Sequence, residues 1–126
     1  ADGVHLGQMD LSPVAARELL GPQAIIGYST HSIEQVHTAA KLPIDYVAFG
    51  PIFETMSKRH ADPVVGLETL VEVKSHIGDL PLVAIGGIRP DSIEDVLRSG
   101  ADSAAMISGL WGPTGEVEPQ ISEYFE

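Results

Sequence analysis

The 126-residue sequence contains no cysteine, which excludes disulfide bonds, thiolate metal ligands and cysteine nucleophiles. Basic residues are scarce, because 7 Lys+Arg stand against 18 Asp+Glu and give a formal net charge of −11. Such a chain lacks the basic field that holds nucleic acid or anionic lipid, so we expect neither kind of partner. No apolar run approaches the roughly 18 residues of a membrane span. With 44% hydrophobic residues, the chain is predicted to form a single globular domain, residues 1–126.

Short apolar runs alternate with segments of helical periodicity. The runs are too short for helices and lack the alternation of a half-exposed strand, so we expect strands buried on both faces. Buried strands that alternate with helices predict an α/β fold with a parallel sheet. The expected strands are Val4–Leu6, Ala24–Tyr28, Tyr46–Phe49, Leu82–Ile85 and Ala104–Ile107.

Helix boundaries are also signalled in the sequence. Ser12-Pro13 is typical of an N-cap followed by a proline in the first turn, Ser32 to Gln35 fits a capping box, and Asp91 to Glu94 fits an Asp-started version. Glycine favours the position just after a helix. The glycines expected to end helices are Gly21, Gly78 and Gly100.

The periodicity is compatible with an open doubly wound sheet or with part of an eight-stranded barrel. An acidic residue precedes three of the expected strands, as Asp2, Asp45 and Asp102. Repetition of this kind favours the barrel. Because a barrel needs about eight strands, we predict a partial TIM (β/α)8 barrel of five parallel βα units, with edge strands left unpaired.

Ligands of parallel α/β folds bind at the carboxyl ends of the strands, where polar and glycine residues concentrate in this sequence. Asp10 follows the first strand and is interpreted either as a hard-metal ligand or as a turn residue. His31 follows the second strand and is interpreted either as a general base or as a residue that pins the next helix. The imidazoles of His5 and His37 are interpreted as core or helix-face residues.

Two further segments are candidates for phosphate binding. Gly86-Gly87, with Ile107-Ser108-Gly109 after the next strand, fits either a phosphate site or a pair of tight turns. The connection of residues 50–65 is long for its position, and its Thr55, Ser57 and Lys58 can bind a phosphate or diphosphate. The alternative for this loop is a solvated excursion without a ligand.

As a set and in this order, these motifs resemble the thiamine-phosphate synthase family, whose members are (β/α)8 barrels. The resemblance implies a transferase of thiamine biosynthesis that joins hydroxymethylpyrimidine diphosphate to thiazole phosphate with Mg²⁺ and releases pyrophosphate. It also implies a cytoplasmic location. The segments that carry the resemblance are residues 1–11, 27–31, 45–47, 50–58, 84–88 and 106–108.

The resemblance also implies roles for individual residues. Asp10 matches a magnesium ligand, while Ser29 and Lys58 match contacts to the pyrimidine diphosphate and are the candidate catalytic residues. The residues that match the thiazole-phosphate site are Thr55, Met56, Ser57, Gly87, Ile107 and Ser108.

Family members are near twice this length, and the chain resembles strands four to eight, so we expect the first three βα units, with the second magnesium carboxylate, to be missing. The expectation is a carboxyl-terminal portion that is inactive by itself and that self-associates or pairs with the missing amino-terminal half. Two alternatives stay open: a thiazole tautomerase-like isomerase with His31 as its base, and a non-catalytic phosphate-binding half-barrel.

Overall fold

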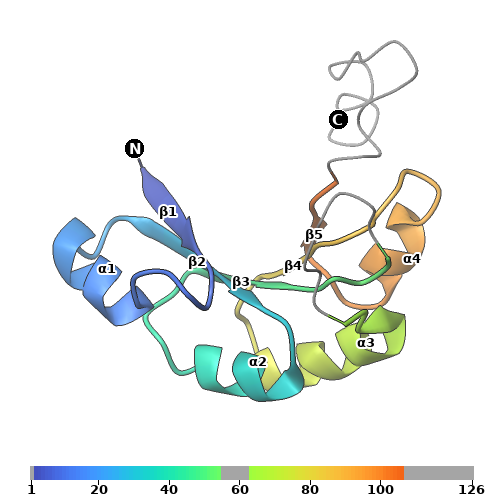
Figure 1. Cartoon of the computed structure of the whole chain (residues 1–126), viewed down its shortest axis with the longest axis horizontal. Helices are drawn as coiled ribbons and strands as arrows, with labels where there is room; N and C mark the ends of the chain where they lie inside the picture. The colour runs from blue at the N-terminus through green and yellow to red at the C-terminus, as the bar shows by residue number, and fades with distance from the viewer. Residues whose placement is uncertain (1, 55–62, 107–126) are drawn as a thin grey trace, which may run out of the picture.

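The computed structural model describes residues 2–54 and 63–106, in which strands and helices alternate along the chain (Figure 1). Each strand is followed by a helix, as the alternation of apolar runs and amphipathic segments predicts. The elements in chain order are β1 (Gly3–Leu6), α1 (Pro13–Leu20), β2 (Ile25–Thr30), α2 (Ile33–Ala39), β3 (Tyr46–Phe49), α3 (Gly66–Ile77), β4 (Leu82–Ala84), α4 (Ile93–Arg98) and β5 (Ser103–Ala104).

The strands form a 5-stranded sheet in the order β1-β2-β3-β4-β5, and all neighbours are parallel. A doubly wound sheet reverses its strand order at a switch point, whereas a barrel adds its strands sequentially. Figure 1 shows the sheet curving between β1 and β5, with the helices on its outer side. The predicted α/β class is confirmed, and the sequential order and one-sided helices are those of a barrel rather than a doubly wound sheet.

The main core lies between the sheet and the helices. Val47 and Phe49 of β3 are fully buried in the same cluster as Leu70 and Val73 of α3. Because alternate strand residues point to opposite faces, Tyr46 and Ala48 of the same strand belong to the face without helices. That second face is therefore where polar strand residues can be accommodated.

The expectation that every strand is buried on both faces is wrong for the first strands. Val4 and His5 of β1 are exposed, and Ile25 of β2 is 52% exposed. In the described residues β1 pairs only with β2 and carries helices on one face only, so its apolar run does not imply two covered faces. Strand bounds shift accordingly, since β2 extends through Ser29 and Thr30, and Ile107 lies outside the described residues.

Two of the predicted helix starts are confirmed. Ser12 Oγ accepts a hydrogen bond from the Ala15 backbone N–H at 3.2 Å, and Pro13 begins α1. Ser32 Oγ accepts from the Gln35 backbone N–H at 3.2 Å. The Gln35 side chain, however, accepts from the His31 backbone N–H rather than from that of Ser32, at 2.8 Å. The reciprocal half of this capping box is therefore displaced by one residue.

The Asp-started cap predicted at Asp91 is wrong. Helix α4 begins after Ser92, whose backbone is already in the right-handed helical region and whose side chain makes no capping bond. Ser92 Oγ instead accepts from the Arg89 backbone N–H at 3.1 Å, within the turn that precedes the helix. The glycines predicted to follow helices all have positive φ: Gly21 (88°), Gly78 (60°) and Gly100 (115°).

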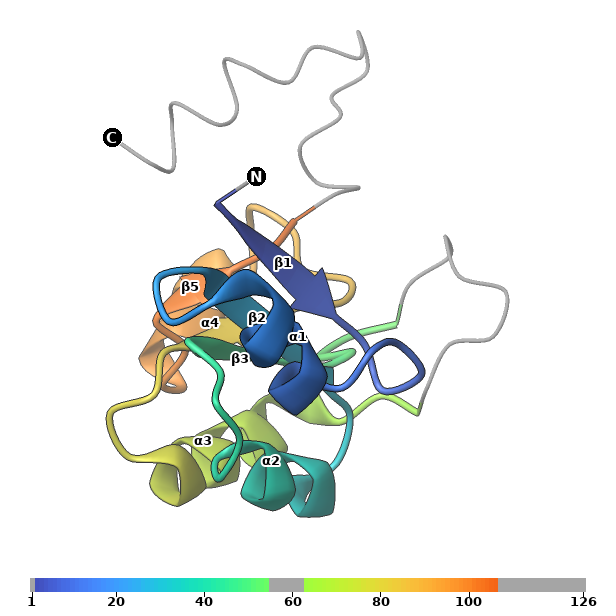
Figure 2. The ribbon, with the colours of Figure 1, turned by 90° about the vertical axis from the view of Figure 1, so that its left-hand side faces the viewer.

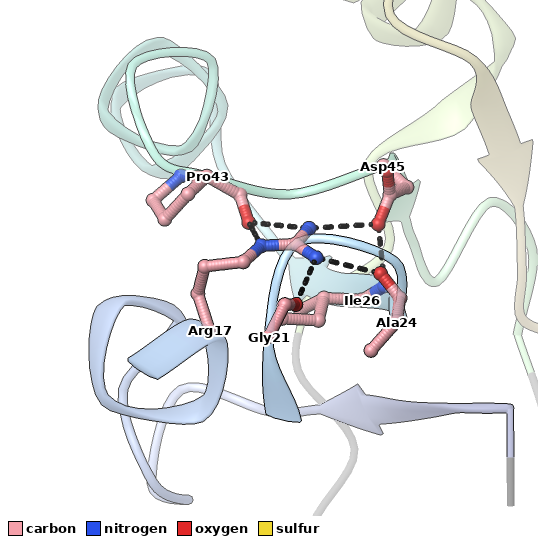
Figure 3. A network of polar contacts seen from close by, with 6 residues as sticks. All are labelled: Arg17, Gly21, Ala24, Ile26, Pro43 and Asp45. Carbon is pink, nitrogen blue, oxygen red and sulfur yellow. Dashed lines mark hydrogen bonds and ion pairs between the residues drawn. The ribbon is translucent and has the colours of Figure 1, made fainter. Parts of the chain in front are cut away.

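The acidic residues that precede strands have a structural role at the amino-terminal edge of the sheet. Asp45 Oδ2 accepts from the Ile26 backbone N–H at 2.7 Å, and the Asp45 N–H donates to the Ile26 carbonyl at 2.7 Å (Figure 3). Asp102 repeats both bonds with Leu82, each at 2.8 Å. Each acid therefore holds its own strand to the first residues of the preceding strand. Among the described residues, no helix has the length and apolar character needed to cross a membrane.

Candidate active site at the carboxyl edge of the sheet

The carboxyl ends of the strands meet at one edge of the sheet. Figure 2 shows the turn after β1 and the chain after β3 on this same side. The chain after β3 is joined to the turn after β4, because the Phe53 backbone N–H donates to the Gly86 carbonyl at 3.1 Å. The parallel topology therefore brings the sequence-predicted candidates of β1, β2 and β4 to one edge, where α/β barrels bind their ligands.

Asp10 forms part of a closed turn after β1. Its Oδ2 accepts from the Gly7 backbone N–H at 2.7 Å, and its own N–H donates to the Gly7 carbonyl at 3.2 Å. The turn interpretation of Asp10 is therefore confirmed. Among residues 2–54 and 63–106, no hydrogen bond reaches the second carboxylate oxygen, which leaves one hard oxygen for a cation.

This geometry can be tested against Mg²⁺, which commonly takes one or two protein carboxylates together with waters and substrate phosphate oxygens. The exposed Asp10 carboxylate satisfies that requirement as a single ligand. Within the part of the chain that the structure describes, no group of three or more His, Cys, Asp or Glu side chains could hold a metal ion. Asp10 could therefore serve as one ligand of a magnesium site, and the described residues do not form such a site by themselves.

Ser29 is fixed on the helix-free face of β2 by two neighbours. Gln8 Nε2 donates to the Ser29 carbonyl at 2.8 Å, and His5 Nε2 lies 2.6 Å from Ser29 Oγ. The other ring nitrogen of His5, Nδ1, lies 2.8 Å from the Tyr46 hydroxyl. The two rings are stacked, with centroids 5.6 Å apart and an interplanar angle of 24°. A candidate substrate contact is thus linked through an imidazole to a tyrosine on the next strand.

The interpretation of His5 as a core or helix-face residue is wrong. Strand alternation places its side chain on the face opposite the helices, where it lies exposed between the two hydroxyl partners. Although the residue is exposed, partial desolvation of its ring lowers the pKa of His5 below its usual 6.5, and the nearby Asp10 carboxylate opposes this shift only in part. The ring is therefore neutral at physiological pH. The sequence does contain one signal for the cluster of His5, Ser29 and Tyr46, which is a glycine inside β2.

That glycine, Gly27, creates the space in which the two rings meet. It lies between His5 and Tyr46 in the register of the sheet, paired with each on either side. A Cβ at this position would overlap the Tyr46 ring. Glycine in the middle of a strand often marks such a close approach. Gly27 therefore allows Tyr46 to reach across β2 to β1.

His31 is engaged at the start of α2. Its Nδ1 lies 2.8 Å from the Gly50 carbonyl oxygen, which can only accept, so Nδ1 carries the proton. Its backbone N–H donates to Gln35. These contacts agree with the interpretation that His31 pins the helix, and they exclude Nδ1 as the proton acceptor of a base-catalysed reaction.

Gly86 and Gly87 form a turn that requires glycine. Their φ angles are 94° and 68°, and a Cβ on Gly86 would lie 2.5 Å from Pro51 Cα. A Cβ on Gly87 would overlap the backbone oxygen of Glu54. The close approach between this turn and the chain after β3 explains both glycines, and the role of Gly87 in phosphate binding stays a prediction. The remaining candidates lie outside the described residues: Thr55, Met56, Ser57, Lys58, Ile107 and Ser108.

Comparison with known proteins connects the chain with a family. The chain is 51% identical over 108 residues to the thiamine-phosphate synthase of Koribacter versatilis. The matched segment covers 86% of this chain and 51% of that protein. It is 46% identical over 110 residues to the thiamine-phosphate synthase of Azorhizobium caulinodans, covering 87% of this chain and 51% of that protein. The chain therefore spans about half the length of the curated relatives it matches.

A solved structure supports the same relationship. The thiamine phosphate pyrophosphorylase from Pyrococcus furiosus is 35% identical and superposes with a TM-score of 0.78, over 100% of this chain and 62% of that one. The family model for thiamine monophosphate synthase matches residues 1–110, which include β1 to β5 and the carboxyl edge described above. The chain belongs to the thiamine monophosphate synthase family.

Proposed function

We propose that this chain supplies part of the active site of a thiamine-phosphate synthase, which couples hydroxymethylpyrimidine diphosphate with thiazole phosphate and releases pyrophosphate. The observation that carries the proposal is that one turn after β1 contacts both residues at the carboxyl edge: the Gly7 N–H donates to Asp10 Oδ2, and Gln8 Nε2 donates to the Ser29 carbonyl. Asp10 offers an oxygen for a cation, and Ser29 offers a hydroxyl for an anion. A diphosphate with its cation can bind both groups.

The proposed reaction makes specific demands on these residues. The bond between the pyrimidine methylene carbon and the diphosphate oxygen breaks, and its electron pair leaves with the diphosphate. The thiazole nitrogen then forms the new carbon–nitrogen bond. Mg²⁺, when bound, neutralises charge that develops on the leaving group. Asp10 would hold the cation, Ser29 would donate to a diphosphate oxygen, and Lys58, outside the described residues, would add a positive charge.

The two alternative functions are less well supported. A tautomerase needs neither a metal nor a diphosphate contact, and the Nδ1 of its candidate base, His31, is held by Gly50. The curated relatives above carry the name thiamine-phosphate synthase. A non-catalytic binding module would still need the phosphate site at Gly87, for which the structure offers a packing explanation.

We also propose that the sheet is completed by further strands, either from the remaining units of an eight-stranded barrel or from a second copy of the chain. In the described residues β1 uses only one of its edges, and the face that carries His5 is exposed. Exposed apolar side chains gather on β1, α1 and the start of β2: Val4, Val14, Leu19, Leu20 and Ile25. Sedimentation of the 126-residue chain would reveal a dimer, whereas a well-folded monomer would exclude self-association. A cytoplasmic location stays a prediction from the resemblance.

A chimera tests the proposed function directly. The matched segment of the Koribacter versatilis synthase would be replaced by this chain, and pyrophosphate release would be followed with both substrates and Mg²⁺. We expect Mg²⁺-dependent release, which Asp10→Asn and Ser29→Ala each reduce roughly a hundredfold. Asp91→Asn, on the exposed turn before α4, is the matched control. A folded chimera that releases no pyrophosphate would contradict the proposal, and thiazole isomerisation without Mg²⁺ would favour the tautomerase.

A further inference from the structure

Two hydrogen bonds join the side chains of three neighbouring strands. His5 on β1 lies 2.8 Å from the Tyr46 hydroxyl on β3 and 2.6 Å from the Ser29 hydroxyl on β2. We propose that Tyr46 and His5 are positioning residues that orient the Ser29 hydroxyl as a hydrogen-bond donor, and so favour the binding of anionic oxygen at this position. The proposal deepens the function proposed above and rests on it for the identity of the ligand as a diphosphate. Neither His5 nor Tyr46 has to touch the substrate.

The argument begins with the number of protons on the ring. A neutral imidazole has one N–H and one nitrogen lone pair, so it donates to one neighbour and accepts from the other. In one arrangement Tyr46 donates to Nδ1 and His5 Nε2–H donates to Ser29 Oγ. In the other, Nδ1–H donates to Tyr46 and the Ser29 hydroxyl donates to Nε2. In the first arrangement the Ser29 hydrogen is available to a ligand, and in the second it is used in the bond to His5.

Acid strength selects the first arrangement. A phenol is a stronger acid than an aliphatic alcohol and is therefore the better donor to an imidazole lone pair. The Tyr46 O–H then donates to the lone pair of His5 Nδ1, so the single hydrogen of the neutral ring is on Nε2. Cooperative polarisation along such a chain strengthens each bond in turn. The short 2.6 Å contact agrees with a strong bond between His5 and Ser29.

The consequence appears at Ser29. Its oxygen accepts from His5, and in the described residues no other hydrogen bond reaches its Oγ, so its own hydrogen is available to a ligand. A hydroxyl whose hydrogen is available to a ligand binds a phosphate oxygen well, because that oxygen can only accept. Gln8 adds to the orientation by holding the Ser29 carbonyl at 2.8 Å. Gly27 adds to it by leaving room for Tyr46.

Nuclear magnetic resonance of the full 126-residue chain, without any ligand, tests the proton arrangement. The ring ¹⁵N shifts of His5 distinguish the two tautomers, and contacts between ring protons of His5 and Tyr46 report that the pair has formed. We expect the Nε2–H tautomer together with those contacts, and a more mixed population in Tyr46→Phe. An Nδ1–H tautomer, or absence of the ring contacts, would overturn the proposal.

Kinetics of the chimera test the effect on the ligand. His5→Leu should raise the KM for the pyrimidine diphosphate about tenfold, His5→Gln should restore most of the loss by donating to Ser29, and His37→Leu on α2 is the control. In a Ser29→Ala background, His5→Leu should add no further loss, because it acts through Ser29. An equal loss in both backgrounds would overturn the proposal. If the wild-type chimera shows no turnover while the tautomer is as expected, the proposed function fails and the proton arrangement stands.

Discussion

Arg17 and Asp45 form an ion pair that joins α1 to the segment before β3, with Arg17 Nη2 2.9 Å from Asp45 Oδ2 (Figure 3). The same carboxylate oxygen accepts from the Ile26 backbone N–H, so the ion pair also contacts the start of β2. Lys74 and Asp102 repeat the arrangement at 2.9 Å around Leu82 of β4. The guanidinium, unlike the ammonium, also donates to three backbone carbonyls, those of Gly21, Ala24 and Pro43.

Arg17→Ala should destabilise the protein by about 2 kcal/mol, because hydrogen bonds to a charged donor are lost and partly buried carbonyls are left without partners. Arg17→Lys should recover little, since an ammonium cannot reproduce the planar fork. Urea unfolding measures both changes. The matched control is Arg98→Ala, which removes an exposed pair with Glu94 and should cost less than about 0.5 kcal/mol. Equal effects at both arginines would contradict the structural role of Arg17.

Stability should fall in acid because of Asp45 and Asp102. The Ile26 backbone N–H and then Arg17 hold the pKa of Asp45 below its ordinary value of 3.8, and the Leu82 N–H and then Lys74 do the same for the pKa of Asp102. Since the folded state binds these protons less readily than the unfolded state, the stabilisation is complete above pH 3.8 and is lost as the pH falls through the lowered folded values.

Urea unfolding midpoints measured from pH 6 down to a pH below 3.8 would test this dependence of stability on pH. Asp45→Asn and Asp102→Asn should flatten the acid loss, and the double variant should flatten it further. Asp91→Asn is the control, because the Asp91 side chain is 84% exposed and 4.0 Å from Arg89. An unchanged slope in the double variant would show that other carboxyls cause the acid loss.

Gly87→Ala should be costly for two separate reasons. Its φ of 68° strains an L-residue, and its Cβ would overlap the Glu54 backbone oxygen. Gly66→Ala is the matched control, because its φ is 81° and no atom lies within 4 Å of the added Cβ. We expect about 1–2 kcal/mol for Gly66→Ala and about 2–3 kcal/mol more for Gly87→Ala from overpacking. Thermal or urea unfolding compares the loss of stability in the two variants. Equal losses would exclude an overlap at Gly87.

Gly27→Ala should displace the Tyr46 ring from His5, because the added Cβ overlaps that ring. We expect a loss of about 2 kcal/mol of stability from overpacking. Adding Tyr46→Ala should remove the overlap, so the double variant should be more stable than the sum of the single effects predicts. A double-mutant cycle by urea unfolding measures the coupling, and strict additivity would contradict the contact.

Local patterns in the sequence were sufficient for the elements of the fold. The apolar run of Tyr46–Phe49 predicts β3 with its observed bounds, and Ser12-Pro13 predicts the start of α1. Both depend on residues within a few positions of one another. Where several residues can satisfy the same local need, the prediction fails, as at α4, where Ser92 rather than Asp91 precedes the helix.

In the candidate site, too, local patterns predict some residues and miss those whose environment depends on distant parts of the chain. The positions of Asp10 and Ser29 were predictable, because polar residues directly after or at the end of an apolar strand lie at the carboxyl edge of any parallel sheet. His5 was not predictable, because its environment depends on Ser29, 24 positions away, and on Tyr46, 41 positions away.

The sequence by itself therefore determined the alternating strands and helices, the parallel sheet and the edge at which chemistry is expected, since these follow from hydrophobic periodicity and short-range capping. Only the tertiary structure decided which face His5 occupies and that Gly27 leaves room for Tyr46. The physical reason is the register of β1, β2 and β3, which places His5, Gly27 and Tyr46 in one row across the sheet. That register is decided by packing and hydrogen bonding among distant segments, which no local pattern records.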